Sequence, residues 1–299
     1  MSKDLRSWLS LFILAGIWGA SFILMKRGMF DETGGHIFSD SQVGALRMAI
    51  AGLVMLPFGL MNLRKIKHWK QVVYLLIVGS CGNFFPAFLF TFAETKLSSG
   101  LAGMLNSFTP FFTLILGFLF FKQKIRLKQV IGLLIAFFGI CILVGILNSA
   151  PVEISLIHVG AILLATLMYA TSLNTIKFKL SEFKSLEIAS LSFTFLAIPA
   201  WIVTLSLNTS HVLQTNEHAF EALGYISILS IFGTCLALLL FNRIIALKSP
   251  MFASSVTYMI PIVAVILGVL LNNEKFYTSQ FVGMLVIVGG VYLVNSKQK

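Results

Sequence analysis

Long apolar segments alternate with short polar ones along the chain, and each apolar segment is about as long as a membrane is thick. An α-helix needs about 20 residues, at a rise of about 1.5 Å each, to cross a hydrocarbon core of about 30 Å. Segments 111–121 and 132–147 are apolar on every face, whereas a strand of a membrane barrel would alternate. The pattern predicts an all-α membrane protein. Its ten expected transmembrane helices are residues 8–25, 42–61, 69–93, 98–121, 127–147, 156–176, 186–207, 219–241, 249–271 and 277–294.

The second half of the chain repeats features of the first half at an offset of 151 residues. The matched pairs include Ser21 and Ser172, Gly82 and Gly233, Pro110 and Pro261, Gly132 and Gly283, and Gly139 and Gly290. We expect a first repeat at 1–148 and a second at 149–299, each with five spans. Because five is odd, the second repeat would cross the membrane in the opposite direction. Inverted repeats of this kind are typical of transporters that work by alternating access.

Composition and charge support the membrane assignment and indicate its orientation. Hydrophobic residues make up 58% of the chain and charged residues 11%, whereas a soluble domain carries about 25% charge. The net charge of +11 could suggest a nucleic-acid partner, but basic residues in a membrane protein first report orientation. With the N-terminus inside, 17 of the 22 Lys and Arg residues fall on the cytoplasmic side. We therefore expect both termini in the cytoplasm, a multi-pass protein of the cell membrane and no nucleic acid.

The sequence shows no sign of a cofactor, a metal site or a cleaved leader. The three cysteines fall inside predicted spans without a CxxC spacing, and the histidines show no ligand spacing. The first apolar segment lacks a small-x-small cleavage site, so we interpret it as the first helix. No nucleophile motif or paired carboxylate at mid-depth is present, so an enzyme is not indicated.

Two prolines near the middle of matched spans mark the main candidate site. Pro110 and Pro261 would each free a backbone carbonyl four residues earlier, on Asn106 and Thr257. Ser254 lies on the same predicted helix face as Thr257. Freed carbonyls beside small polar residues suit a backbone that lines a cavity, and matched interrupted spans point to a transporter binding site. The alternative is that the two prolines only kink helices and shape the bundle.

Further candidates lie in the first, third and sixth spans. Trp18 and Ser21 are matched by Tyr169 and Ser172, which suggests an aromatic wall with hydroxyl donors, or else close packing of helices. Asn83 shares a predicted face with Glu94, near the outer end of the third span. Glu94 is either plainly solvated or the best candidate for proton coupling.

Arg47 is the one cation inside a predicted span, where a central arginine costs about 2.5–3.5 kcal/mol or more. It either extends to the outer interface or faces a cavity, where it would bind an anionic group or pair with Glu94. The glycines of the fifth and tenth spans form stripes suited to close helix contact, either as peripheral support or as the interface of a homodimer.

These residues resemble those of the drug/metabolite transporter superfamily, and within it the EamA-type exporters, over essentially the full length. The resemblance rests on the ten-span layout, the segment 17–22 (IWGASF), Arg47, Pro110, Pro261 and the segment 273–275 (NEK). It implies a cavity lined by the first, third, fourth, sixth, eighth and ninth spans, and efflux of small metabolites, often amino acids, from a bacterial cytoplasm. Such proteins often have an acidic residue just after the fourth span, where this chain has Gln123, whereas the matching Glu274 is kept. The resemblance therefore does not extend to a role that needs a carboxylate at both positions.

We therefore expect a secondary transporter of the bacterial inner membrane that exports a small organic solute, with protons as a candidate coupling ion. A neutral or zwitterionic, partly apolar solute fits better than a sugar phosphate, which would need several cations in the cavity. The alternatives are a facilitator without ion coupling and a membrane sensor or scaffold that transports nothing.

Overall fold

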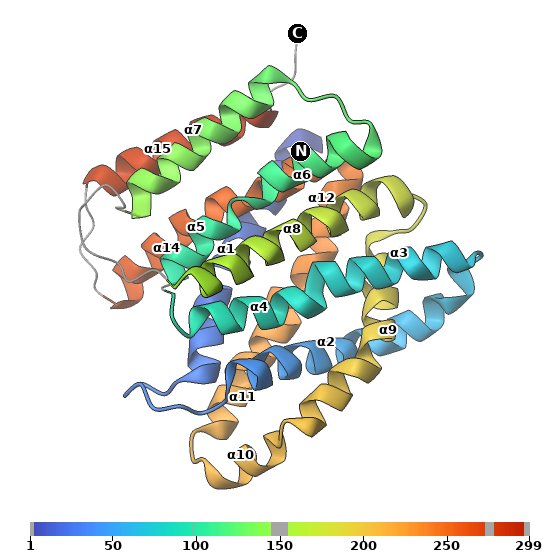
Figure 1. Cartoon of the computed structure of the whole chain (residues 1–299), viewed down its shortest axis with the longest axis vertical. Helices are drawn as coiled ribbons and strands as arrows, with labels where there is room; N and C mark the ends of the chain where they lie inside the picture. Colours follow the sequence, from blue (N-terminus) through green and yellow to red (C-terminus); the bar gives the residue numbers. More distant parts are fainter. Residues whose placement is uncertain (1–2, 98, 145–154, 273–277, 296–299) are drawn as a thin grey trace.

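The computed structural model describes residues 3–97, 99–144, 155–272 and 278–295, and every regular element within these ranges is helical. The elements before residue 145 are α1 (Lys3–Met29), α2 (Asp40–Asn62), η1 (Leu63–Lys65), α3 (Trp69–Gly79), η2 (Ser80–Phe84), α4 (Phe85–Glu94), α5 (Ser99–Asn106), α6 (Thr109–Phe121) and α7 (Leu127–Val144). Those after residue 154 are α8 (Leu156–Lys179), α9 (Ser185–Ser206), α10 (Thr209–Thr215), α11 (Ala219–Ile228), η3 (Leu229–Leu236), α12 (Ala237–Leu247), α13 (Pro250–Ser254), α14 (Val256–Asn272) and α15 (Thr278–Asn295). Figure 1 shows their arrangement.

Six helical runs in this part of the chain are long and apolar enough to cross a membrane. They are Leu5–Met29, Asp40–Lys65, Trp69–Glu94, Leu156–Lys179, Ser185–Ser206 and Ala219–Leu247. Four shorter apolar helices, Thr109–Phe121, Leu127–Ile142, Pro250–Val263 and Phe281–Val294, fall in the other four predicted segments. The all-helical class is thus confirmed over the described residues. The expected boundary between repeats, at residues 148 and 149, and the segment 273–275 lie outside them.

Polar side chains fix where several helices begin. Ser39 caps α2: its hydroxyl accepts from the Gln42 backbone N–H at 3.2 Å, while the Gln42 side chain accepts from the Ser39 N–H at 2.9 Å. Such a reciprocal box satisfies two N–H groups that have no partner inside a helix. Ser249 caps α13 with a 3.0 Å bond from the Phe252 N–H, and Pro250 follows it, where a missing N–H costs nothing.

Glycine allows two pairs of antiparallel helices to pack closely. On α7, a Cβ at Gly139 would lie 2.8 Å from the backbone N of Ile287, and a Cβ at Gly290 of α15 would lie 2.5 Å from that of Ala136. Gly52 of α2 similarly lies against the backbone of Ala197 in α9. The helices α7 and α15 run side by side at one edge of the molecule (Figure 1). The glycine stripes of the fifth and tenth predicted spans therefore pack against each other within one chain.

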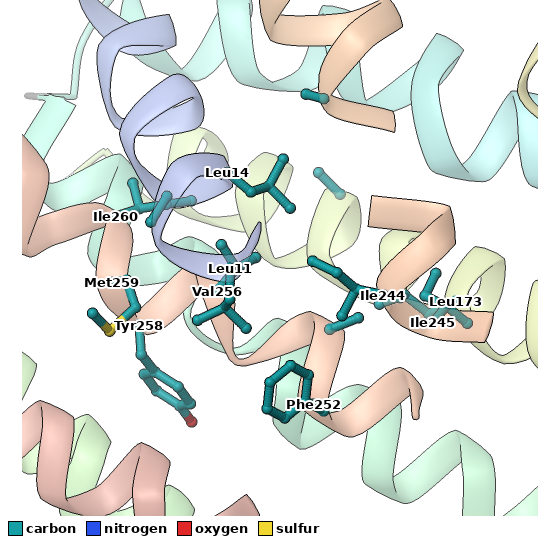
Figure 2. Packing of buried hydrophobic residues seen from close by; sticks show 14 of the residues in the cluster. Leu11, Leu14, Leu173, Ile244, Ile245, Phe252, Val256, Tyr258, Met259 and Ile260 are labelled. Carbon is teal, nitrogen blue, oxygen red and sulfur yellow. The ribbon is translucent and has the colours of Figure 1, made fainter. Parts of the chain in front are cut away.

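The first helix of each half of the chain, α1 or α8, packs mainly against helices of the other half. Helix α1 contacts α14 and the run from α11 through η3 to α12, whereas α8 contacts α5, α6 and the run from α3 through η2 to α4. Figure 2 shows part of the core that results, where Leu11 and Leu14 of α1 lie near Val256 and Ile260 of α14. The two halves are thus interleaved around a shared centre.

The outer surface of the bundle is apolar. Phe118 and Phe120 of α6 are 52% and 73% exposed, and Leu205 of α9 is 73% exposed. Exposed aromatic and aliphatic side chains at this density suit contact with lipid rather than with water.

Candidate functional site

A cavity of about 100 Å³ lies between the central helices, enough for several water molecules or part of a small solute. Its described lining comes from α1, α2, α3, η2, α4, α5, α6, α8, α9, η3, α12 and α14, and none of it from α7 or α15. Two spans that were not expected in the lining also contribute to it. The second span contributes Arg47 of α2, and the seventh contributes Ile188, Ala189 and Ser192 of α9.

Most residues predicted for the site lie on this cavity. Those that line it are Trp18, Ser21, Arg47, Asn83, Asn106, Tyr169, Ser172 and Thr257. The remaining four, Glu94, Pro110, Ser254 and Pro261, are buried but do not belong to the lining. The cavity thus brings together predicted residues that lie up to 239 positions apart, Trp18 and Thr257.

Two aromatic side chains in matched positions, Trp18 and Tyr169, line the cavity. The Trp18 indole Nε1 donates a 3.0 Å hydrogen bond to the Gly233 carbonyl, and its ring meets Phe241 edge-on with centroids 4.9 Å apart. Tyr169 stacks on Phe90 with centroids 5.9 Å apart. Both rings are therefore held in place by neighbours and present fixed apolar surfaces.

The cavity is also lined by two π-helical segments at matched positions. Gly82 and Asn83 lie in η2, and Gly233 and Thr234 lie in η3. The Ser172 hydroxyl fills the space that a side chain at Gly82 would need, and the Ser21 hydroxyl lies 2.8 Å from where a Cβ of Gly233 would be. Each matched serine thus packs on the π segment of the other half. Segments of this kind are rare and often occur at functional sites.

Arg47 faces the cavity. Its Nε donates a 2.9 Å hydrogen bond to the Thr234 hydroxyl in η3, and its Nη1 lies 3.9 Å from the Met25 sulfur. The alternative that Arg47 extends to the outer interface is therefore wrong, because Thr234 holds the guanidinium between α2 and η3. Arg47 and Glu94, both of which the structure describes, form no ion pair with each other.

Glu94 is only 3% exposed, so the expectation of a solvated side chain is wrong. The sequence places it near a span end, but α2 and α8 pack against α4, the helix that ends at Glu94. Neither carboxylate oxygen has a hydrogen-bond partner in the described structure. A buried carboxyl without a partner is costly when it is ionised, which makes it a candidate for proton handling.

The matched prolines behave differently from each other. Pro110 lies at the start of α6, directly after a break at residues 107–108, whereas Pro261 lies inside the continuous helix α14, six residues after the break at Ser255. The expectation of two equivalent interruptions is therefore wrong.

The freed carbonyls are also occupied. Asn106 O accepts from the Thr109 hydroxyl at 2.8 Å, and Thr257 O accepts from the Ser107 hydroxyl at 3.2 Å. The Thr257 hydroxyl itself donates to Ser254 O at 2.9 Å, and the Ser254 hydroxyl donates to Met251 O at 3.1 Å. Hydroxyl groups of the bundle thus supply the bonds that the prolines remove.

The model of the EamA-like transporter family matches this chain twice, over residues 6–145 and 156–296. The chain belongs to this family. An uncharacterized transporter of Archaeoglobus fulgidus is 23% identical over 98% of this chain and 100% of its own length. The uncharacterized inner membrane transporter YedA of Escherichia coli K12 is 26% identical over 95% of this chain and 89% of its own. A protein of the same strain named "probable amino-acid metabolite efflux pump" is 22% identical over 93% and 90%.

A solved crystal structure shares the fold of this EamA-like transporter, with a TM-score of 0.67, 16% identity and 97% coverage of both chains. The protein is a membrane transporter of the drug/metabolite transporter superfamily. Family and apolar helices together place it in the inner membrane as a multi-pass protein.

Four polar residues that line the cavity of this EamA-like transporter were not predicted for the site: Thr109, Ser192, Thr234 and Asn242. The Ser192 hydroxyl and the Asn242 side-chain carbonyl are buried and have no hydrogen-bond partner in the described structure. The Asn242 amide donates weakly to Ser185 O at 3.5 Å. Ser192 is one of several hydroxyl residues in α9, and Asn242 lies near a predicted span end, so neither stood out in the sequence.

Proposed function

We propose that this protein exports a small organic metabolite, such as an amino acid, from the cytoplasm by alternating access. The observation that carries the proposal is the central cavity, which the two halves of the chain line together with matched aromatic, hydroxyl and π-helical residues. A site between two similar halves of opposite orientation can open to each side in turn. The efflux-pump relative supports amino acids as the first solutes to test.

The proposal includes ten spans in two inverted repeats, residues 1–148 and 149–299, with both termini in the cytoplasm. Antiparallel packing of α7 on α15 and of α2 on α9 supports this arrangement, because matched helices of inverted repeats must run in opposite directions. The excess of Lys and Arg on one side supports the orientation.

The test is uptake of labelled amino acids into proteoliposomes that contain the purified protein, with and without an imposed pH gradient. Saturable, protein-dependent uptake supports a transporter of this class. Replacing Asn106 and Thr257 by alanine should lower the rate, while Ser206→Ala, at an exposed position outside the cavity, should not. Unchanged kinetics in both cavity variants, at normal protein levels, would reject the site.

The position of Glu94 favours a second candidate, a facilitator without ion coupling, because this carboxyl lies outside the described cavity lining. In a proton-coupled exporter, a pH gradient should drive accumulation in the wild type and not in Glu94→Gln. In a facilitator, both proteins should exchange solute equally at any gradient. Glu221→Gln, an exposed carboxylate on α11, is the matched control.

A further inference from the structure

The charge of the cavity is carried by one side chain. Of the described residues that line it, Arg47 is the only one with a formal charge at neutral pH, and no aspartate, glutamate, lysine or histidine accompanies it. The field inside an apolar cavity with a single guanidinium favours an anion and opposes a cation, since charges interact strongly where water is scarce.

The guanidinium also has donors to spare. Of its five N–H groups, the Nε–H donates to the Thr234 hydroxyl, and the structure gives the others no oxygen acceptor. The bond to Thr234 fixes the plane of the group and leaves the two Nη atoms for a ligand. A carboxylate matches that geometry because its two oxygens can accept two parallel N–H bonds.

A second polar pole lies toward the other end of the cavity. Asn242 follows Thr234 by eight residues on the same helical run, which corresponds to about 12 Å at a rise of about 1.5 Å per residue. The Asn242 side-chain carbonyl, which belongs to the cavity lining, is buried without a partner. Buried polar atoms without partners are uncommon, and here a ligand group that donates a hydrogen bond would satisfy this carbonyl.

The walls between the two poles are apolar and aromatic. Trp18 packs on Phe241, the neighbour of Asn242 in sequence, and Leu238 also lines the cavity. A solute that reaches from Arg47 to Asn242 must therefore place an uncharged, largely apolar body against these rings.

We propose that the solute is an elongated organic acid: its carboxylate binds Arg47, its aromatic or aliphatic body lies against Trp18 and Phe241, and a hydrogen-bond donor at its far end binds the Asn242 side-chain carbonyl. This inference rests on the proposed function and names the class of metabolite. An α-amino acid carries its ammonium next to its carboxylate, where the described lining offers no carboxylate to pair with it. A deaminated acid with the same body should therefore bind better.

The experiment measures binding to the purified protein, and transport in proteoliposomes, for four probes with a similar body. They are 3-(4-hydroxyphenyl)propanoate, 3-phenylpropanoate, tyrosine and tyramine. We expect the hydroxylated acid to bind best, about tenfold tighter than tyrosine. Tyramine should bind least, because it lacks the carboxylate that would bond to the Arg47 guanidinium and hydrogen bonds between charged groups are the strong ones.

Two variants separate the poles. Arg47→Gln should weaken both acids about tenfold or more and should strengthen tyramine, because the cation loses an opposing charge. Asn242→Leu should reduce the hydroxylated acid to the affinity of 3-phenylpropanoate without changing the latter, a selective loss that general destabilisation would not produce. Arg64→Gln, an exposed arginine outside the cavity, is the control. If Arg47→Gln does not fold, the wild-type series and Asn242→Leu still decide.

Tighter binding of tyrosine or tyramine than of the acids would overturn the inference, as would unchanged affinity for the acids in a folded Arg47→Gln protein. Transport of amino acids without binding of either acid would overturn it while leaving the proposed function in place. Movement of none of these solutes, nor of any amino acid in the panel, would count against both.

Discussion

The position of a residue within its apolar segment decided whether the sequence could predict it as a site residue. Trp18, Asn83 and Asn106 lie near the middle of long apolar segments, where a polar group needs a reason, and they do line the cavity. Glu94 and Asn242 lie near segment ends, where solvation is the ordinary expectation. Their burial depends on helices that come from elsewhere in the chain, and a single sequence does not show which helices those are.

The loop between α1 and α2 contains a residue whose charge orders the backbone. Asp31 accepts from the Thr33 hydroxyl at 2.6 Å and from the N–H groups of Thr33 and Gly35, both at 2.8 Å. Gly34 completes the turn at φ +87°, a conformation that glycine adopts without strain. The bonds from Thr33 and Gly35 lower the pKa of Asp31 below its ordinary value of 3.8.

A depressed pKa means that the ionised carboxylate favours the folded loop. Its contribution is present above the ordinary pKa of 3.8 and is lost as the pH falls through the lower value of the folded loop. We therefore predict that Asp31→Asn speeds hydrogen exchange in residues 31–36 at pH 7, as measured by mass spectrometry. Glu32→Gln, at an exposed neighbour that pairs only with Arg27, is the control. Equal protection in both variants would contradict this role of Asp31.

At the scale of elements, the packing of α7 on α15 follows from glycine positions that the sequence already shows. The stripes predicted a close helix contact, but left open whether the partner was a helix of the same chain or of a second copy. The structure uses them inside the chain, with backbone atoms of Ala136 and Ile287 at the contact points.

We predict that Gly290→Ala destabilises the protein by about 1–3 kcal/mol, the usual range for overpacking a tight contact. The new methyl group would lie 2.5 Å from the Ala136 N and 2.8 Å from its Cα, and backbone atoms cannot turn aside. Gly289→Ala, with no atom within 4 Å of its Cβ, should instead be neutral or slightly stabilising because alanine favours helix. Thermal unfolding in detergent, followed by a thiol-reactive dye on the native cysteines, compares the two. Equal melting temperatures for the two variants would contradict a tight contact between α7 and α15 at Gly290.

The broken helices could be predicted in place but not in detail. Pro110 lies beside a helix break and Pro261 removes one hydrogen bond inside the continuous helix α14, and which hydroxyl replaces that bond depends on contacts between α5 and α14. The Ser107 hydroxyl, from the α5–α6 break, lies 3.2 Å from both Gly103 O and Thr257 O, and Thr257 O is open to it because Pro261 has no N–H to offer that carbonyl.

Because the Ser107 hydroxyl replaces the N–H that Pro261 lacks, we predict an energetic coupling between these two residues, which are 154 positions apart. Ser107→Ala should cost about 1–2 kcal/mol, since it leaves Thr257 O buried without that donor. In a Pro261→Ala background the cost should be smaller, because the new N–H of residue 261 can bond Thr257 O within α14. A double-mutant cycle of unfolding free energies, measured by titration with SDS, gives the coupling. Equal costs of Ser107→Ala in both backgrounds would remove the link between the serine and the proline.

At the scale of the whole molecule, hydrophobicity and the 151-residue offset predicted the helical class and the pairing of segments. They could not predict the interleaving of the halves, since an offset says which helices are alike and not which ones touch. Two hydrogen bonds mark the opposite ends of the bundle. Asn216 donates to His36 O at 3.4 Å at one end, and Gln71 donates to the Glu182 carboxylate at 2.6 Å at the other.

These two ends give a direct test of the inverted topology. Loops 31–39 and 216–218 should face the outside, and loops 66–68 and 180–184 should face the cytoplasm, because each pair meets at one end and Lys and Arg concentrate at the second. We predict that single cysteines at Glu32 and Glu217, in a variant with Cys81, Cys141 and Cys235 replaced, react with a membrane-impermeant maleimide on intact cells. Cysteines at Lys67 and Ser181 should react only after permeabilisation. Labelling of either inner position in intact cells would contradict two repeats of opposite orientation, and with them alternating access by exchange of their conformations.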